Sequence, residues 1–262
     1  MPRRPARTEH GCAWVTGGSS GIGAAIVHRL VEKGWRVAAT ARDRHALARL
    51  AEASPDGAIL PAPADVSDLA AMKAAAEEIR AKFGPIGLLV ANAGIYLPVP
   101  APEIDVSRFR RTFEVNVLGV AHALAQVLPD MAARGEGHIH IVSSATGFGG
   151  MPTASAYGAS KAALINMAEC LKIELERTGV GVSLSTPGFV DTPAQTDNAF
   201  PKPFMVSPKL AAQRIVAGIQ RGGFETTFPR RFTWPLKALY ALPKPIYLAL
   251  VRKQTGWNKP AA

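Results

Sequence analysis

Residues 12–23 of the chain read CAWVTGGSSGIG. The first five residues, 12–16, are mostly apolar and predict a short buried strand. They run directly into glycines at the spacing Gly-x-x-x-Gly-x-Gly, after which Ile22, Ile26 and Leu30 recur at the spacing of one helix face. Glycines allow the backbone to turn tightly against a phosphate, and the first N–H groups of a helix attract one. The segment therefore predicts a strand, a turn and a helix that hold a pyrophosphate; a plain Gly-rich turn is the alternative.

A second group of residues indicates acid/base chemistry. Tyr157 and Lys161 are four residues apart, so on a helix their side chains share one face. A nearby cation favours the phenolate, so Lys161 is expected to lower the pKa of Tyr157 from its ordinary value of about 10. Ser144 precedes the tyrosine by thirteen residues and supplies a hydroxyl that can hold a carbonyl or alcohol oxygen. The same Tyr-x-x-x-Lys spacing arises by chance on surface helices, so its meaning depends on the glycine motif.

Together these motifs resemble the short-chain dehydrogenase/reductase family in its compact single-domain form, over roughly residues 10–230. Two positions depart from the family pattern, Ala91 where many relatives have Asn and Gly87 where many have Asp, and neither carries the chemistry. The resemblance implies four catalytic residues: Asn116, Ser144, Tyr157 and Lys161. It also implies a nicotinamide cofactor bound by Gly17, Ser19, Ser20, Gly21, Ile22, Gly23, Arg42, Asp65, Val66, Asn92, Ala93, Gly94, Tyr157, Lys161, Pro187, Gly188, Val190 and Thr192, and no metal.

The resemblance further implies a role for each catalytic residue in carbonyl–alcohol chemistry. During reduction Tyr157 donates the proton to the substrate oxygen, which Ser144 orients. Lys161 lowers the pKa of Tyr157 and holds the nicotinamide ribose, while Asn116 positions a water that links Lys161 to solvent. Two other classes stay open. A non-catalytic NADP-binding sensor needs the cradle but not these four residues, and a sugar-nucleotide epimerase needs a larger C-terminal domain than the residues after 230 can build.

The choice of cofactor depends on the end of the second predicted strand. NAD enzymes of this fold usually have an acidic residue there, which binds the ribose 2′-hydroxyl. This chain has Ala41 followed by Arg42, whose guanidinium attracts a 2′-phosphate and can bind it through two hydrogen bonds. Asp43 is acidic but lies at the wrong offset. The sequence therefore favours NADP(H), with a solvated Arg42 as the alternative.

Strands and helices are predicted to alternate along the chain. Apolar runs predict strands over residues 12–16, 36–41, 58–62, 86–91, 138–142, 180–186 and 224–228. Between them, helical patterns begin after the glycine motif, near residue 44, after Ser67 as an N-cap, over about 103–133, around the Tyr–Lys pair and at Ser207-Pro208. Such alternation predicts an α/β fold, a doubly wound parallel seven-stranded Rossmann-type sheet with helices on both faces. The glycine turn and the segments at residues 92, 144 and 187 each follow a strand, so they should meet at one rim.

Length and composition limit the domain organisation. A chain of 262 residues can form one large α/β domain. We expect a flexible tail at residues 1–10, a single catalytic domain at 11–230 and an extension at 231–262. The two cysteines, Cys12 and Cys170, are expected to be buried free thiols, which fits a reducing cytoplasm. No signal peptide and no membrane-spanning run of 18 apolar residues is expected.

The net charge of +10 is confined to one end of the chain. Residues 201–262 contain eleven Lys or Arg and one acidic residue, Glu225, while the rest of the chain is balanced. A nucleic-acid surface across the domain is therefore not expected. Two short apolar helices broken by prolines are expected within residues 232–253. They are predicted to cover the substrate pocket, to meet a partner subunit or to lie on an anionic membrane surface.

The substrate and the assembly are predicted from the loops at the rim and from the long helices. Apolar side chains that could line a substrate pocket are Tyr96, Leu97, Phe148, Met151, Phe200, Phe204 and Met205. They favour a small hydrophobic alcohol or ketone over a sugar. The helices that carry Asn116 and Tyr157 resemble those that pair across the two-fold axis in the family, so a homodimer or homotetramer is expected.

Overall fold

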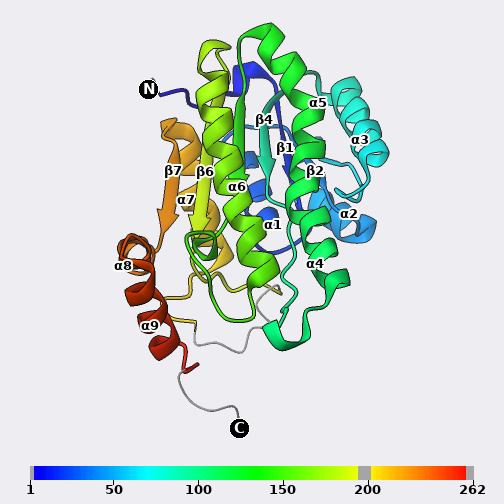
Figure 1. The fold of residues 1–262 in the computed structure, drawn as a ribbon. Coiled ribbons are helices and arrows are strands. Elements are labelled where there is room, and N and C mark those ends of the chain that lie inside the picture. Colours follow the sequence, from blue (N-terminus) through cyan, green and yellow to red (C-terminus); the bar gives the residue numbers. More distant parts are fainter. Residues whose placement is uncertain (1–2, 194–201, 258–262) are drawn as a thin grey trace.

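A parallel sheet forms the centre of the fold (Figure 1), in a computed structural model that describes residues 3–193 and 202–257. That part of the chain contains seven strands in the order β3-β2-β1-β4-β5-β6-β7, and every neighbouring pair is parallel. The strands are β1 (Cys12–Thr16), β2 (Val37–Thr40), β3 (Ile59–Pro61), β4 (Ile86–Ala91), β5 (His138–Val142), β6 (Gly181–Pro187) and β7 (Glu225–Phe228). The strand order reverses between β1 and β4, which confirms the predicted doubly wound fold and places the ligand crevice beyond the ends of these strands.

Helices cover both faces of this sheet. One face packs against α3 (Leu69–Phe83), α5 (Gly119–Arg134) and α6 (Ser155–Glu174), and the other against α1 (Gly21–Val31), α2 (Arg44–Glu52) and α7 (Pro208–Arg221). Alternate residues of β1 enter the two cores: Trp14 faces α3, α5 and α6, whereas Val15 faces α1, α2 and α7. Because both faces are buried, a central strand reads as a continuous apolar run. For this reason β4 and β5 have the bounds predicted from sequence, as does β1, and the ends of the other strands differ from the prediction by at most one residue.

Capping side chains set where the helices begin. Ser207 accepts a hydrogen bond from the Leu210 N–H and Pro208 occupies the first turn of α7, as predicted. The predicted cap of α3 is wrong: Asp68, not Ser67, accepts from the Ala71 N–H. The Ser67 hydroxyl instead donates to the Asp65 carboxylate at 2.7 Å. Two adjacent residues with capping side chains were available, and the Ser67 hydroxyl is engaged instead by Asp65, two residues earlier, and by the Arg111 guanidinium of α4.

The long helix predicted over about 103–133 begins later and contains an irregular turn. Asp105 caps α4 (Val106–Phe113), a π-helical turn follows over Glu114–Leu118, and α5 completes the helix. A π turn adds one residue to the helical cycle, and such turns are frequent at functional sites. Within the described residues, Val106–Arg134 is the one helix long and apolar enough to cross a membrane by length and composition, and 44% of its apolar window is buried inside the molecule. It packs on α3 and α6, as a core helix does.

Two expectations about the chain's ends and its thiols need correction. The N-terminal segment is packed from Arg4 onward, because the Arg4 guanidinium donates to the Glu176 carbonyl and the Arg4 carbonyl meets the ring of His138. The Cys12 thiol is buried in β1, as expected, whereas Cys170 is exposed on α6. Residue 170 follows the helical pattern of α6, but the face that it occupies turns away from the sheet.

The chain after β7 forms two short helices, α8 (Arg230–Tyr240) and α9 (Lys244–Gln254), as the sequence predicts. They lie beside β7 at the lower left of Figure 1, at the end of the sheet where the strands terminate. Lys237 of α8 forms an ion pair with Glu225 of β7. The Tyr247 hydroxyl of α9 donates to the Gly150 carbonyl at 2.7 Å. The extension is therefore attached both to the edge strand and to the loop between β5 and α6.

Candidate active site

A cavity of about 1080 Å³ opens at the carboxyl ends of β1, β4, β5 and β6. Its walls include every residue predicted to bind the cofactor, from the glycine turn to Thr192, and three of the four predicted catalytic residues, Ser144, Tyr157 and Lys161. Segments as far apart in sequence as Gly17 and Thr192 meet here because parallel strands end at the same edge of the sheet. The predicted convergence on one rim is thus realised in the structure.

The glycine turn has room for a ligand and for little else. Gly17 has a φ of +67°, and a Cβ at this position would lie 2.8 Å from the Ala93 Cα. A Cβ on Gly23 would lie 1.9 Å from the Gly17 carbonyl oxygen. Ser20, the N-cap of α1, makes no side-chain capping hydrogen bond, so the first N–H groups of α1 remain available at the cavity. A backbone cradle at a helix N-terminus fits the pyrophosphate of a dinucleotide.

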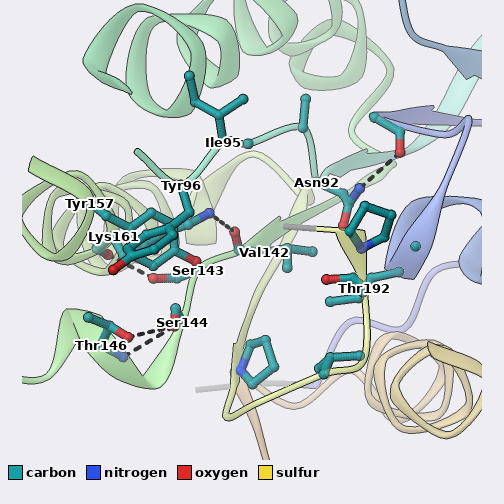
Figure 2. A pocket seen from close by; sticks show the side chains of 18 of the residues that line it. Asn92, Ile95, Tyr96, Val142, Ser143, Ser144, Thr146, Tyr157, Lys161 and Thr192 are labelled. Atoms are coloured by element: carbon teal, nitrogen blue, oxygen red, sulfur yellow. Dashed lines mark hydrogen bonds between the residues drawn. The ribbon is translucent and has the colours of Figure 1, made fainter. Parts of the chain in front are cut away.

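The segment after β4 is tied to this cradle. Thr16 Oγ1 accepts hydrogen bonds from the backbone N–H groups of Asn92 and Ala93, both at 3.1 Å. The Asn92 side-chain amide donates to the Thr16 carbonyl at 3.1 Å and to the Gly17 carbonyl at 3.3 Å. Asn92 therefore fixes the glycine turn from the neighbouring strand, and its amide is directed at that turn rather than at solvent (Figure 2).

Tyr157, Lys161 and Ser144 lie together at the other end of the cavity (Figure 2). Lys161 Nζ donates to the Val142 carbonyl at 3.0 Å and lies 5.7 Å from the centre of the Tyr157 ring. The Tyr96 ring packs edge-on against Tyr157, with centroids 5.1 Å apart. The adjacent Ser143 donates its hydroxyl to the Lys161 carbonyl at 2.7 Å, so it supports the helix rather than facing a substrate. The predicted helix face shared by Tyr157 and Lys161 is confirmed. The Val142 carbonyl at the end of β5 anchors the Lys161 ammonium.

The Tyr157 phenol has a raised pKa in this structure, where the spacing to Lys161 predicts a lowered one. Burial raises the pKa of Tyr157 to about 12, although its hydrogen bond with Ser144 lowers the value and the nearby Tyr96 raises it. Burial also lowers the pKa of the Lys161 ammonium to about 8. Removal of both groups from water disfavours their charged forms. The sequence pair alone suggests a phenolate, whereas the burial of the site favours a neutral phenol.

Asn116 is the one predicted catalytic residue that does not line the cavity. Its side chain is fully buried within the π turn, where Oδ1 accepts from the Ile95 N–H at 2.8 Å. Nδ2 donates to the Ile95 carbonyl and to the Ser160 hydroxyl, each at 3.0 Å. The amide therefore has protein partners on both of its atoms and holds the loop after β4 against α6.

Two charged features lie at the far end of the nucleotide cradle. Arg42 is exposed on the cavity wall, and Asp43 is used as the cap of α2, where it accepts from the Ala46 N–H at 2.9 Å. Arg111 was not predicted: it donates to the Asp65 carboxylate at 3.0 Å and to the Ser67 hydroxyl at 2.8 Å. Burial acts to raise the pKa of Asp65, but hydrogen bonds from Ser67 and Arg111 hold it below its ordinary value. Asp65 is thus an ionised, fixed acceptor beside the cavity.

The apolar end of the cavity has a different lining from the one predicted. Tyr96, Leu97 and Met151 line it as expected. Phe148 instead lies under the Lys237 ammonium, 4.8 Å from the ring centre, and Phe204 and Met205 are about half exposed outside the cavity wall; Phe200 lies outside the described residues. Phe232 and Leu236 of α8 also line the cavity, in agreement with the alternative that residues 232–253 cover the substrate pocket, and their four-residue spacing puts both on one face of α8. Sequence reasoning missed other lining residues, among them Thr146, Gln254 and Thr255.

A nucleotide cradle that ends beside a buried Tyr–Lys–Ser group defines an oxidoreductase that acts on CH–OH and C=O groups with a nicotinamide cofactor. The family model described as short chain dehydrogenase matches residues 11–201. The chain therefore belongs to the short-chain dehydrogenase family, and the resemblance found in the sequence is confirmed.

Similar proteins support this assignment. An uncharacterized oxidoreductase of Myxococcus xanthus is 36% identical over 244 residues, which covers 92% of this chain and 96% of the relative. The 2-dehydro-3-deoxy-L-rhamnonate dehydrogenase (NAD(+)) of a Sphingomonas strain is 38% identical over 183 residues, or 70% of this chain and 73% of the relative. The crystal structure of a short-chain dehydrogenase from Streptomyces avermitilis superposes with a TM-score of 0.78 at 27% identity, covering 95% of this chain and 99% of that one.

Proposed function

We propose that this protein is an NADP(H)-dependent oxidoreductase that interconverts a carbonyl and an alcohol on a small hydrophobic substrate, with Tyr157 as the acid/base. The observation that carries the proposal is one cavity in which Tyr157, Lys161 and Ser144 lie at one end and the glycine cradle at the other. We further propose that residues 11–230 form the catalytic domain and residues 231–262 an extension to it.

The residues of the cavity have separate roles in the reaction. The bound nicotinamide supplies or accepts the hydride. Ser144 orients the substrate oxygen, and Tyr157 holds the proton that this oxygen receives during reduction. A pKa of about 12 keeps the phenol of Tyr157 protonated at neutral pH, which is the form that a proton donor needs. Lys161 binds the nicotinamide ribose. Asn116 holds the loop after β4 against α6 through its hydrogen bonds to Ile95 and Ser160.

The preference for NADP(H) is supported by the charge at the end of β2. Arg42 lies on the cavity wall, and within the described residues no acidic side chain forms an ion pair with it. Asp43, the nearest carboxylate in sequence, already caps α2. A guanidinium at this place attracts a 2′-phosphate, whereas the acidic residue that favours NAD is missing at Ala41.

Replacing Arg42 with Ala is expected to weaken NADPH binding by roughly tenfold or more and to leave NADH binding nearly unchanged. One charge-assisted contact to a phosphate contributes about 1.5–3 kcal/mol. Arg44→Ala is the matched control, because it removes the same charge from an exposed position that does not line the cavity. Calorimetric titration measures both cofactors, and tighter binding of NAD(H) than of NADP(H) by the native chain would reverse the preference.

The substrate class follows from the apolar end of the cavity. Tyr96, Leu97, Met151, Phe232 and Leu236 line the same cavity as Tyr157. Burial of apolar substrate surface against these side chains stabilises binding by about 25 cal/mol per Å². A small hydrophobic ketone or alcohol is therefore favoured over a sugar.

Steady-state oxidation of NADPH with a panel of carbonyl compounds tests the whole proposal. We expect kcat/KM to rise with the hydrocarbon length of the ketone or aldehyde, and aldose sugars to react poorly. Cofactor binding without turnover of any carbonyl would favour a nucleotide sensor. A preference for sugars would agree with the proposed carbonyl–alcohol reaction but would contradict the proposed hydrophobic substrate class.

We also propose that the protein is a homodimer or homotetramer, paired through α4–α5 and α6. Three large apolar side chains are exposed there: Val106 at 65%, Leu118 at 50% and Ile173 at 64%. Light scattering should give at least a dimer at micromolar concentration, and Ile173→Glu should weaken it because the contact repeats across a two-fold axis. Leu69→Glu, on α3, should leave the mass unchanged. A monomeric native protein would contradict the proposal.

A further inference from the structure

The two C-terminal helices expose much of their apolar surface. In α8 only Thr233 is buried, and in α9 only Tyr247 and Val251. The exposed large apolar side chains of this region are Trp234 at 60%, Tyr240 at 42%, Leu242 at 39%, Ile246 at 49%, Leu248 at 58%, Leu250 at 37% and Trp257 at 51%. We call these residues, with the basic side chains among them, the C-terminal surface. It holds seven of the fifteen large apolar residues exposed in the described part of the chain.

The charge of this surface has a single sign. Its basic residues are Arg230, Arg231, Lys237, Lys244, Arg252 and Lys253, and no Asp or Glu occurs after Glu225. Glu225, the one acidic residue in the sequence after position 200, is already paired with Lys237. The other five basic side chains are exposed, and three of them lie over exposed rings: Arg230 over Trp234, Arg231 over Phe204 and Lys244 over Tyr240. Aromatic and aliphatic groups therefore alternate with uncompensated positive charge.

The C-terminal surface is held in a fixed position. Tyr240 and Tyr247 pack edge-on with centroids 5.7 Å apart, and both approach Gly149, where a Cβ would lie 2.4 Å from the Tyr247 hydroxyl. Phe232 packs on Phe189, with ring centroids 5.5 Å apart. These contacts use the inner side of the helices and leave the apolar and basic side chains outside. The exposure thus belongs to the folded arrangement of α8 and α9.

We propose that the C-terminal surface docks on an anionic lipid bilayer. Exposed Trp, Tyr and aliphatic side chains enter the headgroup boundary, and surrounding Lys and Arg bind anionic headgroups, which is the pattern of interfacial helices. Each helix has eleven residues and is about 16 Å long, far shorter than the roughly 30 Å hydrocarbon core, so the surface lies on the membrane and does not cross it.

The charge argues for a bilayer over a second copy of the chain. A two-fold contact through this surface would place its like charges against one another, which opposes association. An anionic bilayer provides both an apolar interior and a negatively charged surface. Phe232 and Leu236 line the cavity from the inner side of α8, while Trp234 is exposed on its outer side. Docking would therefore bring the apolar end of the cavity next to the lipid. It requires no turnover, so it can hold whether or not Tyr157 acts as proposed.

Co-sedimentation of the full chain with vesicles tests this proposal. The protein should bind phosphatidylglycerol vesicles at low salt, lose most of this binding at about 0.5 M NaCl, and bind phosphatidylcholine vesicles weakly. Arg252→Gln/Lys253→Gln should weaken binding by roughly tenfold or more. Its control is Lys73→Gln/Lys82→Gln, which makes the same change in net charge on α3.

A second pair of variants tests the apolar contribution. Leu248→Gln should weaken vesicle binding several-fold, whereas Leu69→Gln, an equally exposed leucine on α3, should not. Thermal melting and NADPH titration check that each variant is folded. The proposal is overturned if the native chain does not bind anionic vesicles at low salt. It is also overturned if the variants on α3 lose as much vesicle binding as the variants on α9. It is also overturned if Leu248→Gln instead dissociates an oligomer, because the surface then binds a second copy.

Discussion

Replacing Tyr157 with Phe should lower turnover by roughly 10² or more while cofactor binding is largely kept. The change removes the hydroxyl that we propose exchanges the proton and retains the ring, which packs edge-on against Tyr96. Steady-state kinetics on a substrate found in the carbonyl panel measures the loss, and titration with NADPH checks binding. Tyr240→Phe is the control, since it removes the same hydroxyl from α8 outside the cavity.

The pH dependence gives the Tyr157 variant a second readout. Alcohol oxidation needs the phenolate as base, and the pKa of Tyr157 is raised to about 12, so the fraction of phenolate increases with pH across the working range. The native rate of alcohol oxidation should therefore rise with pH, and the residual activity of Tyr157→Phe should lack this rise. Near-native turnover by Tyr157→Phe would refute the acid/base assignment.

Replacing Gly23 with Ala should reduce the affinity for the nucleotide by roughly 10², equivalent to about 2.7 kcal/mol. The added Cβ would lie 1.9 Å from the Gly17 carbonyl oxygen and 2.6 Å from Asn92 Nδ2. The first atom is backbone of the cradle and cannot move as the end of a flexible side chain can, and the second belongs to the amide that fixes the cradle from the segment after β4. The turn must therefore open, and its N–H groups no longer point toward the pyrophosphate.

The control for the Gly23 variant is Gly223→Ala, where an added Cβ meets nothing within 4 Å and the backbone has an ordinary φ. Calorimetric titration with NADPH compares the two proteins, and circular dichroism verifies that both are folded. If Gly23→Ala binds as tightly as the native chain, the nucleotide does not sit in this turn. Should Gly23→Ala fail to fold, Gly21→Ala offers a milder clash, with Thr192 Cγ2 at 3.1 Å, although the φ of +53° at this position also disfavours Ala.

The local parts of this protein were determined by the sequence itself. The bounds of β4 and β5 follow from uninterrupted apolar runs between turn residues, because a strand covered on both faces has no polar positions. The glycine turn and the Tyr157–Lys161 pair follow from spacing along one turn or one helix, which is set by backbone geometry. Their meeting in one cavity follows from parallel topology, which brings the strand ends to one edge.

Only the tertiary structure decided the properties that depend on neighbours distant in the chain. The Lys161 spacing suggests a lowered pKa for Tyr157, but burial from several elements raises it. Likewise Phe232 lines the cavity while Phe204 is exposed, although both are aromatic residues after β6. Desolvation depends on the sum of all packed neighbours, and a helix face is apolar in sequence whether it packs inward or outward. Which side of α8 meets the cavity and which meets solvent is therefore a property of the folded chain alone.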